Sequence, residues 1–216
     1  MVKKPLVIIG AGGHAVSVAS LAISLGFNPI MFVDSNSDRS EIHGIPVQSN
    51  LDAISTTTAL SCVMGIGDNY SRHQAYMKLI TTHPNFDFPT LIHQQATIGS
   101  WVKIEQGCTI FAGARIGASC KIGAFAIMNT DASLDHDSYL AEFASLGPGV
   151  VTGGQVFIDA FSAVGIGSVI KHGLKIEEHS VIGSSSNVLK NIQSYSVVFG
   201  NPAEWQRSRS AGEPYL

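Results

Sequence analysis

An aliphatic residue recurs at every sixth position through the C-terminal half of this 216-residue chain. Between Ile92 and Val188, sixteen of the seventeen positions in this series are aliphatic, and Thr152 is the exception. A second series, two positions before the first, consists of small or β-branched residues except at Leu174. Residues two apart lie on the same face of a strand, whereas a period of six fits neither an α-helix nor a coiled coil. The pattern therefore predicts short strands, joined by bends, that stack into a parallel β-solenoid.

The composition agrees with an architecture that buries many side chains and turns often. Hydrophobic residues make up 45% of the chain, charged residues 13%, and 22 positions are glycine. This is the reverse of a disordered composition, and we expect glycines such as Gly99, Gly117 and Gly153 to form the bends. A net charge of -3 without a basic cluster gives no reason to expect nucleic acid. The longest run of apolar residues and glycine, 6–13, is far shorter than the roughly 20 residues of a membrane span.

We expect a cytoplasmic protein without a metal site. The N-terminus lacks the longer apolar segment and the small-residue cleavage site of a signal peptide. The three cysteines, Cys62, Cys108 and Cys120, are odd in number and form no CxxC pair. Neither disulfides nor a zinc site is therefore predicted, and each cysteine is interpreted as a small buried residue.

Residues 1–90 lack the six-residue period and predict a small α/β domain. An apolar strand at 6–9 is followed by the glycine-rich turn 10–15 and by an amphipathic helix to about residue 25. A second strand at 30–33 ends in Asp34, and further strands are expected near 45–47 and 60–66, in a parallel sheet. A glycine turn before a helix can bind a phosphate, and an acidic residue at the end of the second strand can bind a ribose or base.

The N-terminal domain has room for one mononucleotide half-site, which favours a nucleotide-sugar over a nicotinamide cofactor. A dehydrogenase remains a weak alternative, because the glycine pattern alone is not specific. A second polar turn, 65–72, follows the last expected strand. The candidate substrate-binding residues lie in these two turns and at the end of the second strand: Gly10, Gly12, Gly13, His14, Asp34, Asp68, Asn69 and Arg72.

Taken as a whole, the chain resembles the sialic-acid-O-acetyltransferase-like sugar acyltransferases, which are hexapeptide-repeat transferases, and above all the bacillosamine-type nucleotide-4-amino-sugar N-acetyltransferases. The resemblance rests on Gly10-Ala11-Gly12-Gly13-His14-Ala15, Gly65-Ile66-Gly67-Asp68-Asn69, Leu91-Ile92-His93, the segment 129–143, and Gly200-Asn201-Pro202-Ala203. It implies a nucleotide-sugar-binding domain at 1–90, a left-handed β-helix of three hexads per coil at 91–193, and a C-terminal cap at 194–216. It also implies a homotrimer with active sites between subunits.

His136 matches the histidine that serves as general base in this family. It comes two residues after Leu134 of the aliphatic series, so we expect it at a bend. With three hexads per coil, Gly154 lies one coil further, about 4.8 Å away. A glycine there leaves space beside the imidazole and a backbone N–H within reach, which a reacting thioester carbonyl needs. An imidazole with an ordinary pKa near ~6.5 suits proton transfer at neutral pH.

The surroundings of His136 depart from the family pattern at two positions. The bacillosamine-type enzymes have a glutamate directly after the histidine, whereas this chain has Asp137, with Asp135 as a rival partner. A second active-site histidine of that type falls at Ser145 here, which leaves the sugar open. Asn129 matches a family asparagine near the reacting amine.

The resemblance also assigns residues to acetyl coenzyme A. The segment with Gly200, Pro202 and Ala203 packs against the coenzyme in hexapeptide acyltransferases, where a lysine commonly follows; this chain has Glu204. Charge for the coenzyme phosphates must therefore come from elsewhere. The candidates are Lys171 and Lys190, with Lys175, Arg207 and Arg209 behind them, and His172 is a candidate contact in the column of His136.

The implied function is an acetyl-CoA-dependent N-acetyltransferase that modifies the 4-amino group of a nucleotide-linked deoxyhexose. UDP is the preferred nucleotide, ahead of dTDP and GDP, and the product would be a precursor of surface glycan or glycoprotein. The alternatives are a sugar O-acetyltransferase of the sialic-acid type and a non-catalytic nucleotide-sugar-binding protein.

Overall fold

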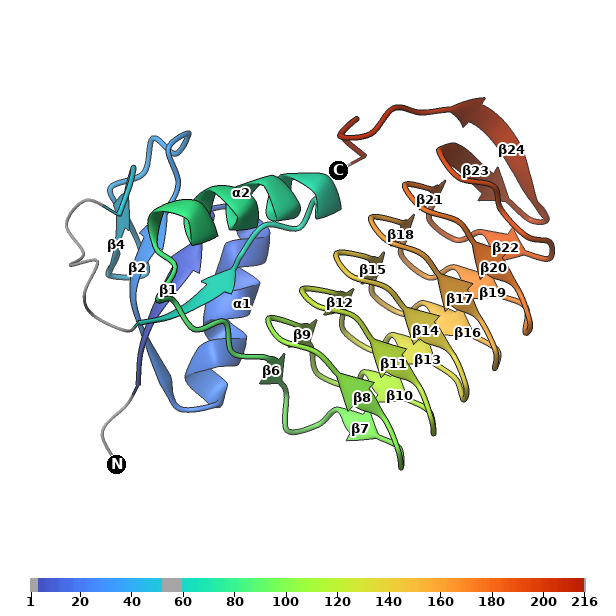
Figure 1. Cartoon of the computed structure of the whole chain (residues 1–216), viewed down its shortest axis with the longest axis horizontal. Helices are drawn as coiled ribbons and strands as arrows, with labels where there is room; N and C mark the ends of the chain where they lie inside the picture. The colour runs from blue at the N-terminus through green and yellow to red at the C-terminus, as the bar shows by residue number, and fades with distance from the viewer. Residues whose placement is uncertain (1–3, 52–59, 216) are drawn as a thin grey trace. The chain divides into compact units, whose positions relative to one another are not determined.

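The computed structural model describes residues 4–51 and 60–215, which form two compact units (Figure 1). The first unit spans Met1–Leu91 and the second spans Ile92–Leu216. Among the described residues, no helix has both the length and the apolar character needed to cross a membrane.

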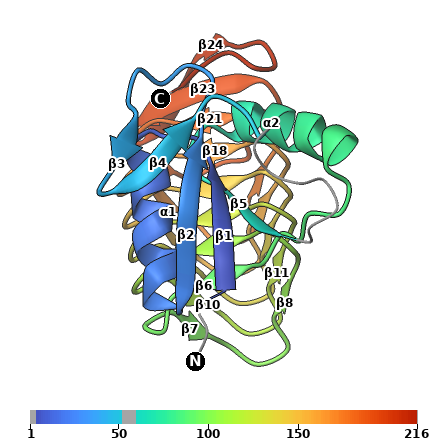
Figure 2. The same ribbon diagram turned by 90° about the vertical axis from the view of Figure 1, so that its left-hand side faces the viewer.

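The N-terminal unit contains a five-stranded sheet with the order β3-β4-β2-β1-β5 (Figure 2). Its strands are β1 (Lys4–Ile9), β2 (Phe27–Val33), β3 (Glu41–Ile42), β4 (Ile45–Gln48) and β5 (Ser61–Met64). Strand β1 pairs in parallel with β2 on one side and with β5 on the other, as predicted. At the edge, β3 pairs antiparallel with β4 through the tight turn at His43 and Gly44, so the sheet is not wholly parallel.

Two helices complete the described part of this unit. Helix α1 (Gly13–Ser24) packs on β1 and β2 and buries Ala15, Val18 and Leu21. Helix α2 (Asn69–Thr82) begins at the second polar turn, where the Asp68 carboxylate accepts the N–H of Ser71 and so caps the helix. The sequence did not predict α2, because its apolar residues are few and weakly periodic.

The second unit is a three-sided parallel solenoid built from two-residue strands (Figure 1). The first sheet contains β7 (Thr97–Ile98), β10 (Arg115–Ile116), β13 (Ser133–Leu134), β16 (Val151–Thr152), β19 (Val169–Ile170) and β22 (Asn187–Val188). The second contains β8 (Lys103–Ile104), β11 (Lys121–Ile122), β14 (Tyr139–Leu140), β17 (Phe157–Ile158) and β20 (Lys175–Ile176). The third contains β6 (Leu91–Ile92), β9 (Thr109–Ile110), β12 (Ile127–Met128), β15 (Ser145–Leu146), β18 (Ala163–Val164), β21 (Val181–Ile182), β23 (Ser196–Gly200) and β24 (Ala203–Ser208).

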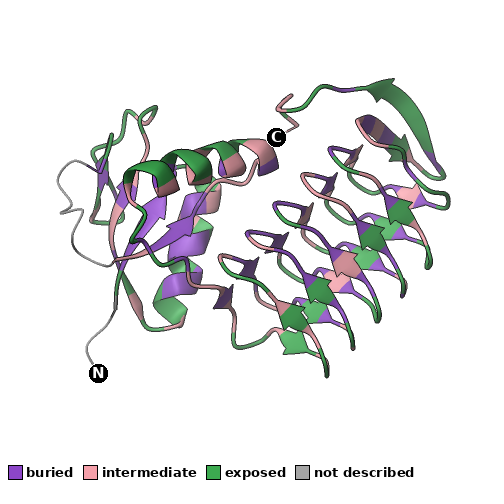
Figure 3. Ribbon diagram, viewed as in Figure 1, coloured by how far each residue is buried: buried purple, intermediate pink, exposed green. Residues whose placement is uncertain are grey.

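The strand register confirms the coil length that three hexads imply. Arg115 pairs with Ser133, and Ser145 pairs with Ala163, so each coil advances by 18 residues. The aliphatic series fills the interior, where Leu134, Leu140 and the other members from Ile110 to Val188 are almost completely buried (Figure 3). The β-solenoid predicted from the six-residue period is therefore confirmed.

Gly117 and Gly153 have a different role from the one expected, whereas five other glycines, Gly107, Gly113, Gly149, Gly167 and Gly173, do form left-handed turns. Several left-handed turn positions hold other residues, among them Ser119, Asp137 and Gln155, which lie 18 apart with φ of 61°, 55° and 57°. Gly117 and Gly153 instead allow close approach of the next coil. A Cβ at Gly117, for example, would lie 2.5 Å from the backbone nitrogen of His136.

The last strands form a hairpin at the end of the third sheet. β23 pairs in parallel with β21, and β24 folds back antiparallel on β23. Residues 196–208 thus extend the solenoid as strands and cover one of its open edges.

Candidate active site

The turn that follows β13 presents His136 and Asp137 side by side. Asp137 adopts a left-handed conformation with φ of 55°. Its Oδ2 lies 2.8 Å from Nδ1 of His136. The two side chains remain 55% and 53% exposed, so the pair is accessible to a ligand.

Asp135 makes a different contact with the same turn. Its Oδ1 accepts the backbone N–H of His136 at 2.7 Å, so this carboxylate holds the main chain and not the ring. Both acids nevertheless favour the imidazolium. The hydrogen bond to Asp137, followed by the charge of Asp135, raises the pKa of His136 above its ordinary value.

The imidazole lies directly against Gly154, one coil further along the solenoid. A Cβ added at Gly154 would collide with Nε2 of His136 and would lie 2.6 Å from its Cε1. The space expected beside Gly154 is therefore present, but the imidazole of His136 occupies it. Any side chain at position 154 would displace the ring.

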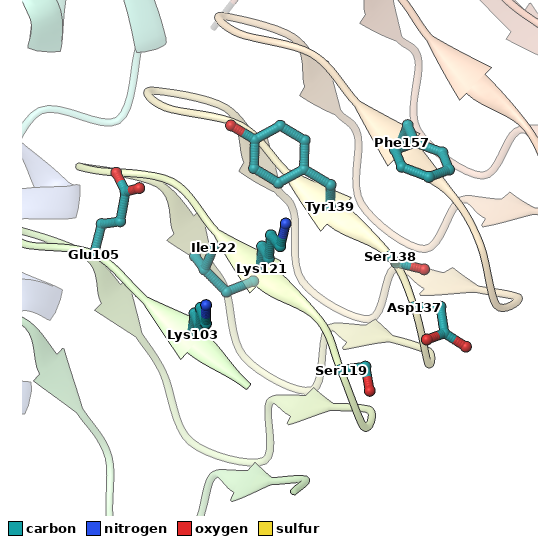
Figure 4. Close-up of a pocket in the computed structure, with 9 residues that line it drawn as sticks. All are labelled: Lys103, Glu105, Ser119, Lys121, Ile122, Asp137, Ser138, Tyr139 and Phe157. Atoms are coloured by element: carbon teal, nitrogen blue, oxygen red, sulfur yellow. The ribbon is translucent and has the colours of Figure 1, made fainter. Parts of the chain in front are cut away.

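A cavity of about 540 Å³ opens beside Asp137 on the outer face of the second sheet (Figure 4). Its lining residues are Lys103, Glu105, Ser119, Lys121, Ile122, Asp137, Ser138, Tyr139 and Phe157. Lys103, Lys121, Tyr139 and Phe157 come from successive coils and sit in register one above another. The cavity thus combines two cationic side chains and two aromatic rings next to the His136–Asp137 pair. Sequence reasoning missed these residues, although their 18-residue spacing, one position before the aliphatic series, was a usable signal.

In the N-terminal unit, the two polar turns meet at one end of the sheet. Oδ2 of Asp34 accepts the N–H of Ala11 at 3.0 Å, which joins the glycine turn to the end of β2. Gly10 has φ of 103°, and a Cβ there would lie 3.1 Å from the carbonyl oxygen of Gly65. Cβ atoms at Gly12 and Gly13 would meet nothing within 4 Å, so the start of α1 is open.

Arg72 and Asn69 lie inside this unit and brace the second turn. Arg72 is 1% exposed and donates to the carbonyl oxygens of Ile66 and Gly67 at 3.0 and 2.9 Å, and to Oδ1 of Asn69 at 2.7 Å. Burial, together with the charge of Arg72, lowers the pKa of His14 to about 4, so its imidazole is neutral at physiological pH.

Comparison with known proteins agrees with both units. The family described as the PglD N-terminal domain matches residues 5–79. The acetyltransferase domain of PglB from Neisseria gonorrhoeae is 28% identical, with a TM-score of 0.87 over 94% of this chain and 100% of that one. PerB from Caulobacter crescentus, solved in complex with CoA and GDP-perosamine, is 27% identical, with a TM-score of 0.87 over 94% and 97% of the two chains.

These similarities support the resemblance to the hexapeptide-repeat sugar acyltransferases and to their bacillosamine-type members. WeeI from Acinetobacter baumannii has the same fold as this chain, at 22% identity and a TM-score of 0.86. A match over a shorter segment is the acyl-[acyl-carrier-protein]–UDP-N-acetylglucosamine O-acyltransferase of Pseudomonas aeruginosa, which is 30% identical over 108 residues, or 50% of this chain. The chain spans only 42% of the length of that curated relative.

The other predicted catalytic and coenzyme residues are spread over several turns. Asn129 follows β12 and therefore lies at a different corner of the coil from His136. Lys171 and His172 are exposed and follow β19, where His172 packs on Gly153. The structure thus places Gly154 against His136, and it places His172 one coil beyond Gly154. It does not bring Asn129 to the same turn as His136.

The C-terminal candidates lie at the end of the third sheet. Nζ of Lys190 forms an ion pair with Oε2 of Glu204 at 3.0 Å. Glu204, which stands where the family commonly has a lysine, is thus paired with Lys190, a candidate for binding the coenzyme phosphates. Gly200 has φ of 113°, Pro202 is exposed and Ala203 is buried. Among the described residues, no group of three His, Cys, Asp or Glu side chains is placed to hold a metal ion.

Proposed function

We propose that this chain transfers the acetyl group of acetyl coenzyme A to the 4-amino group of a nucleotide-linked 4-amino-deoxyhexose, with His136 as general base. The contact of 2.8 Å between Asp137 Oδ2 and His136 Nδ1 carries this proposal. It keeps the proton on Nδ1 and leaves Nε2 as the acceptor, on an exposed turn beside a cavity.

The chemistry requires one proton acceptor and room for a thioester. The amine nitrogen bonds to the acetyl carbon, the C–S bond breaks, and the coenzyme leaves as a thiolate. Nε2 of His136 takes the proton that the amine loses and can return it to the sulfur. Asp137 stabilises the imidazolium between these two transfers. The backbone of Gly154, against which the ring lies, is our candidate for the side on which the thioester carbonyl approaches.

We assign the nucleotide of the sugar substrate to the N-terminal unit. The start of α1 is open at Gly12 and Gly13, and N–H groups at a helix N-terminus suit a pyrophosphate. Asp34 lies at the end of β2, beside that turn, although its Oδ2 already accepts the N–H of Ala11. Arg72 acts in this proposal by holding the second turn, since its guanidinium is buried. UDP is the preferred nucleotide; GDP is the first alternative, because the similar PerB was solved with GDP-perosamine.

A homotrimer would complete the active site in this proposal. Asn129 and His136 occupy different corners of one coil, so the Asn129 of a neighbouring subunit, and not that of the same subunit, would face the reacting amine. Lys171 and His172, which follow β19, two strands beyond β13 in the first sheet, are the proposed coenzyme contacts. Because Lys190 is paired with Glu204, its part in coenzyme binding depends on breaking that ion pair. Both co-substrates are cytoplasmic metabolites, which is why we propose a cytoplasmic enzyme.

Acetylation of a sugar hydroxyl is the second candidate function. Ser145 stands where the bacillosamine-type enzymes have a second histidine, so the acceptor side of the site differs from theirs. In that case His136 would deprotonate a hydroxyl instead of an amine. A non-catalytic nucleotide-sugar-binding protein would need neither the imidazole nor its carboxylate.

Thiol release from acetyl coenzyme A tests these alternatives against a panel of UDP-, dTDP- and GDP-4-amino sugars and free sialic acid. We expect turnover with a nucleotide-4-amino sugar and a loss of about a hundredfold or more in His136→Asn. His43→Asn, an exposed histidine on the β3–β4 turn, is the matched control and should keep the wild-type rate. Turnover with sialic acid alone would favour O-acetylation, and no turnover with any acceptor would overturn the enzymatic proposal.

A further inference from the structure

The regular hydrogen-bond ladder of the solenoid is interrupted immediately before His136. In the first sheet, the residue after each strand donates its N–H to the carbonyl of the aliphatic residue in the next coil. Gly117 donates to Leu134 at 2.8 Å and Gly153 donates to Ile170 at 2.9 Å. Asp135 instead donates to the side-chain hydroxyl of Thr152, at 3.1 Å. Accordingly, β13 and β16 are paired at Ser133 and Val151 but not at the following position.

The residue that interrupts the ladder is also the one that interrupts the aliphatic series. Thr152 is 4% exposed and occupies an interior position that is aliphatic in every other hexad of the series. Valine has nearly the same shape, so the hydroxyl is what distinguishes threonine there. Burying a hydroxyl in an apolar interior is unfavourable unless it is hydrogen-bonded, and packing alone favours an aliphatic residue. Position 152 therefore carries a buried hydroxyl, and the hydrogen bond that it accepts from the N–H of Asp135 accounts for its presence there.

The disturbance is confined to one side of the turn. Beyond His136 the ladder is regular: its carbonyl accepts the N–H of Gln155 at 2.8 Å, and Asp137 donates to Ala118 at 2.9 Å. On the opposite side of Asp135, its carbonyl oxygen lies 3.0 Å from the thiol of Cys120. Hydrogen bonds from a buried thiol or hydroxyl to a backbone carbonyl oxygen recur elsewhere in the solenoid. Sγ of Cys108 lies 3.1 Å from the carbonyl oxygen of Gly123, and Oγ of Ser168 lies 2.9 Å from that of Gly183. The Thr152 contact is thus the feature particular to this turn.

We infer that Thr152 is a positioning residue for His136. Its hydroxyl binds the N–H of Asp135, and Oδ1 of Asp135 in turn accepts the N–H of His136 at 2.7 Å. The two contacts connect the solenoid interior to the backbone of the histidine. They set the turn so that the imidazole lies against Gly154 with Nδ1 at Asp137. The inference rests on the proposed role of His136 as the base.

Two substitutions separate the hydroxyl from the shape of the side chain. Thr152→Val removes the hydroxyl and restores the aliphatic series, whereas Thr152→Ser keeps the hydroxyl. Ser168→Ala is the matched control, because it removes another fully buried hydroxyl that binds a turn carbonyl, away from His136. Thermal unfolding of each variant establishes that it is folded, and we expect Thr152→Val to be at least as stable as the wild type.

The inference predicts a change at His136 that loss of stability would not produce. In Thr152→Val, kcat should fall about ten- to a hundredfold while the KM for acetyl coenzyme A changes little, and Thr152→Ser and Ser168→Ala should stay near the wild-type rate. The Cε1–H resonance of His136, assigned by its absence in His136→Asn, should titrate at lower pH in Thr152→Val because the contact with Asp137 is weakened. A wild-type rate together with an unchanged titration would overturn the inference. The titration needs no substrate, so it still decides the inference if wild-type protein acetylates none of the sugars and the proposed function fails.

Discussion

Oδ2 of Asp137 lies 2.8 Å from Nδ1 of His136, although the two residues are adjacent in the chain and both belong to an exposed turn. Asp137 has φ of 55°, in the left-handed region, at this turn. The nearby Asp135 binds the backbone of the histidine instead. The two acids of the Asp-His-Asp segment thus have separate tasks, which can be tested one at a time.

Replacing Asp137 by asparagine should move the pH profile of the reaction. Protonated His136 cannot accept a proton, so kcat/KM rises as pH increases through the pKa of the imidazole. The hydrogen bond that the imidazole donates to Asp137, and after it the charge of Asp135, raises this pKa above 6.5. In Asp137→Asn the rising limb should therefore shift to lower pH, and the plateau should fall about tenfold or more because the imidazolium is less stabilised. Initial rates between pH 5 and 9 give both values.

Asp135→Asn is the comparison for that experiment. Its charge is the smaller influence on the imidazole, so the limb should move in the same direction by less. A larger shift of the pH profile in Asp135→Asn than in Asp137→Asn would contradict this interpretation. It would mean that Asp135, and not Asp137, is the main partner of the imidazole.

Alanine at Gly154 should disable the site without unfolding the solenoid. The added Cβ would occupy the position of Nε2 of His136, while φ at Gly154 is outside the left-handed region, so the backbone tolerates alanine. The imidazole must rotate away and lose its contact with Asp137. We expect kcat to fall about a hundredfold, with a small change in melting temperature. Steady-state kinetics and thermal unfolding measure the two effects, and an undiminished kcat would show that the ring does not react from this position.

The native protein should give no background in the thiol-release assay. Cys62, Cys108 and Cys120 are all 0% exposed, and burial raises the pKa of the Cys62 and Cys120 thiols. Since the thiolate is the reactive form, all three should be inert to an aromatic disulfide reagent until the chain unfolds. Titration with that reagent should detect no thiol in buffer and three in denaturant. Rapid labelling of the native protein would contradict the burial of these side chains.

The repeat predicted the solenoid well because its periodicity is a direct record of which side chains face inward. The same reasoning located His136 at a bend, since only its distance from Leu134 was needed. The periodicity could not predict whether Asp135 or Asp137 contacts the imidazole, because the answer depends on the local geometry of the turn. Helix α2 was missed for another reason: residues 69–82 bury few side chains, and the buried Arg72 and Asn69 are polar. Thr152 was visible as an exception, but its meaning required knowing which N–H it binds.

A column of stacked rings at the corner between the second and third sheets should contribute strongly to stability. Phe125, Phe143 and Phe161 stack with centroids 5.1 and 5.8 Å apart, and the column continues through His179 to Tyr195. Phe143 is 5% exposed and has a ring on either side, so Phe143→Ala should lower the free energy of unfolding by about 3–5 kcal/mol. Phe157 is 46% exposed, and Phe157→Ala should cost less than about 1 kcal/mol. Chemical denaturation measures both. Equal effects of the two substitutions would show that the stacked column is not a stabilising element, whereas the expected difference would identify it as a support between coils that is independent of the His136 turn.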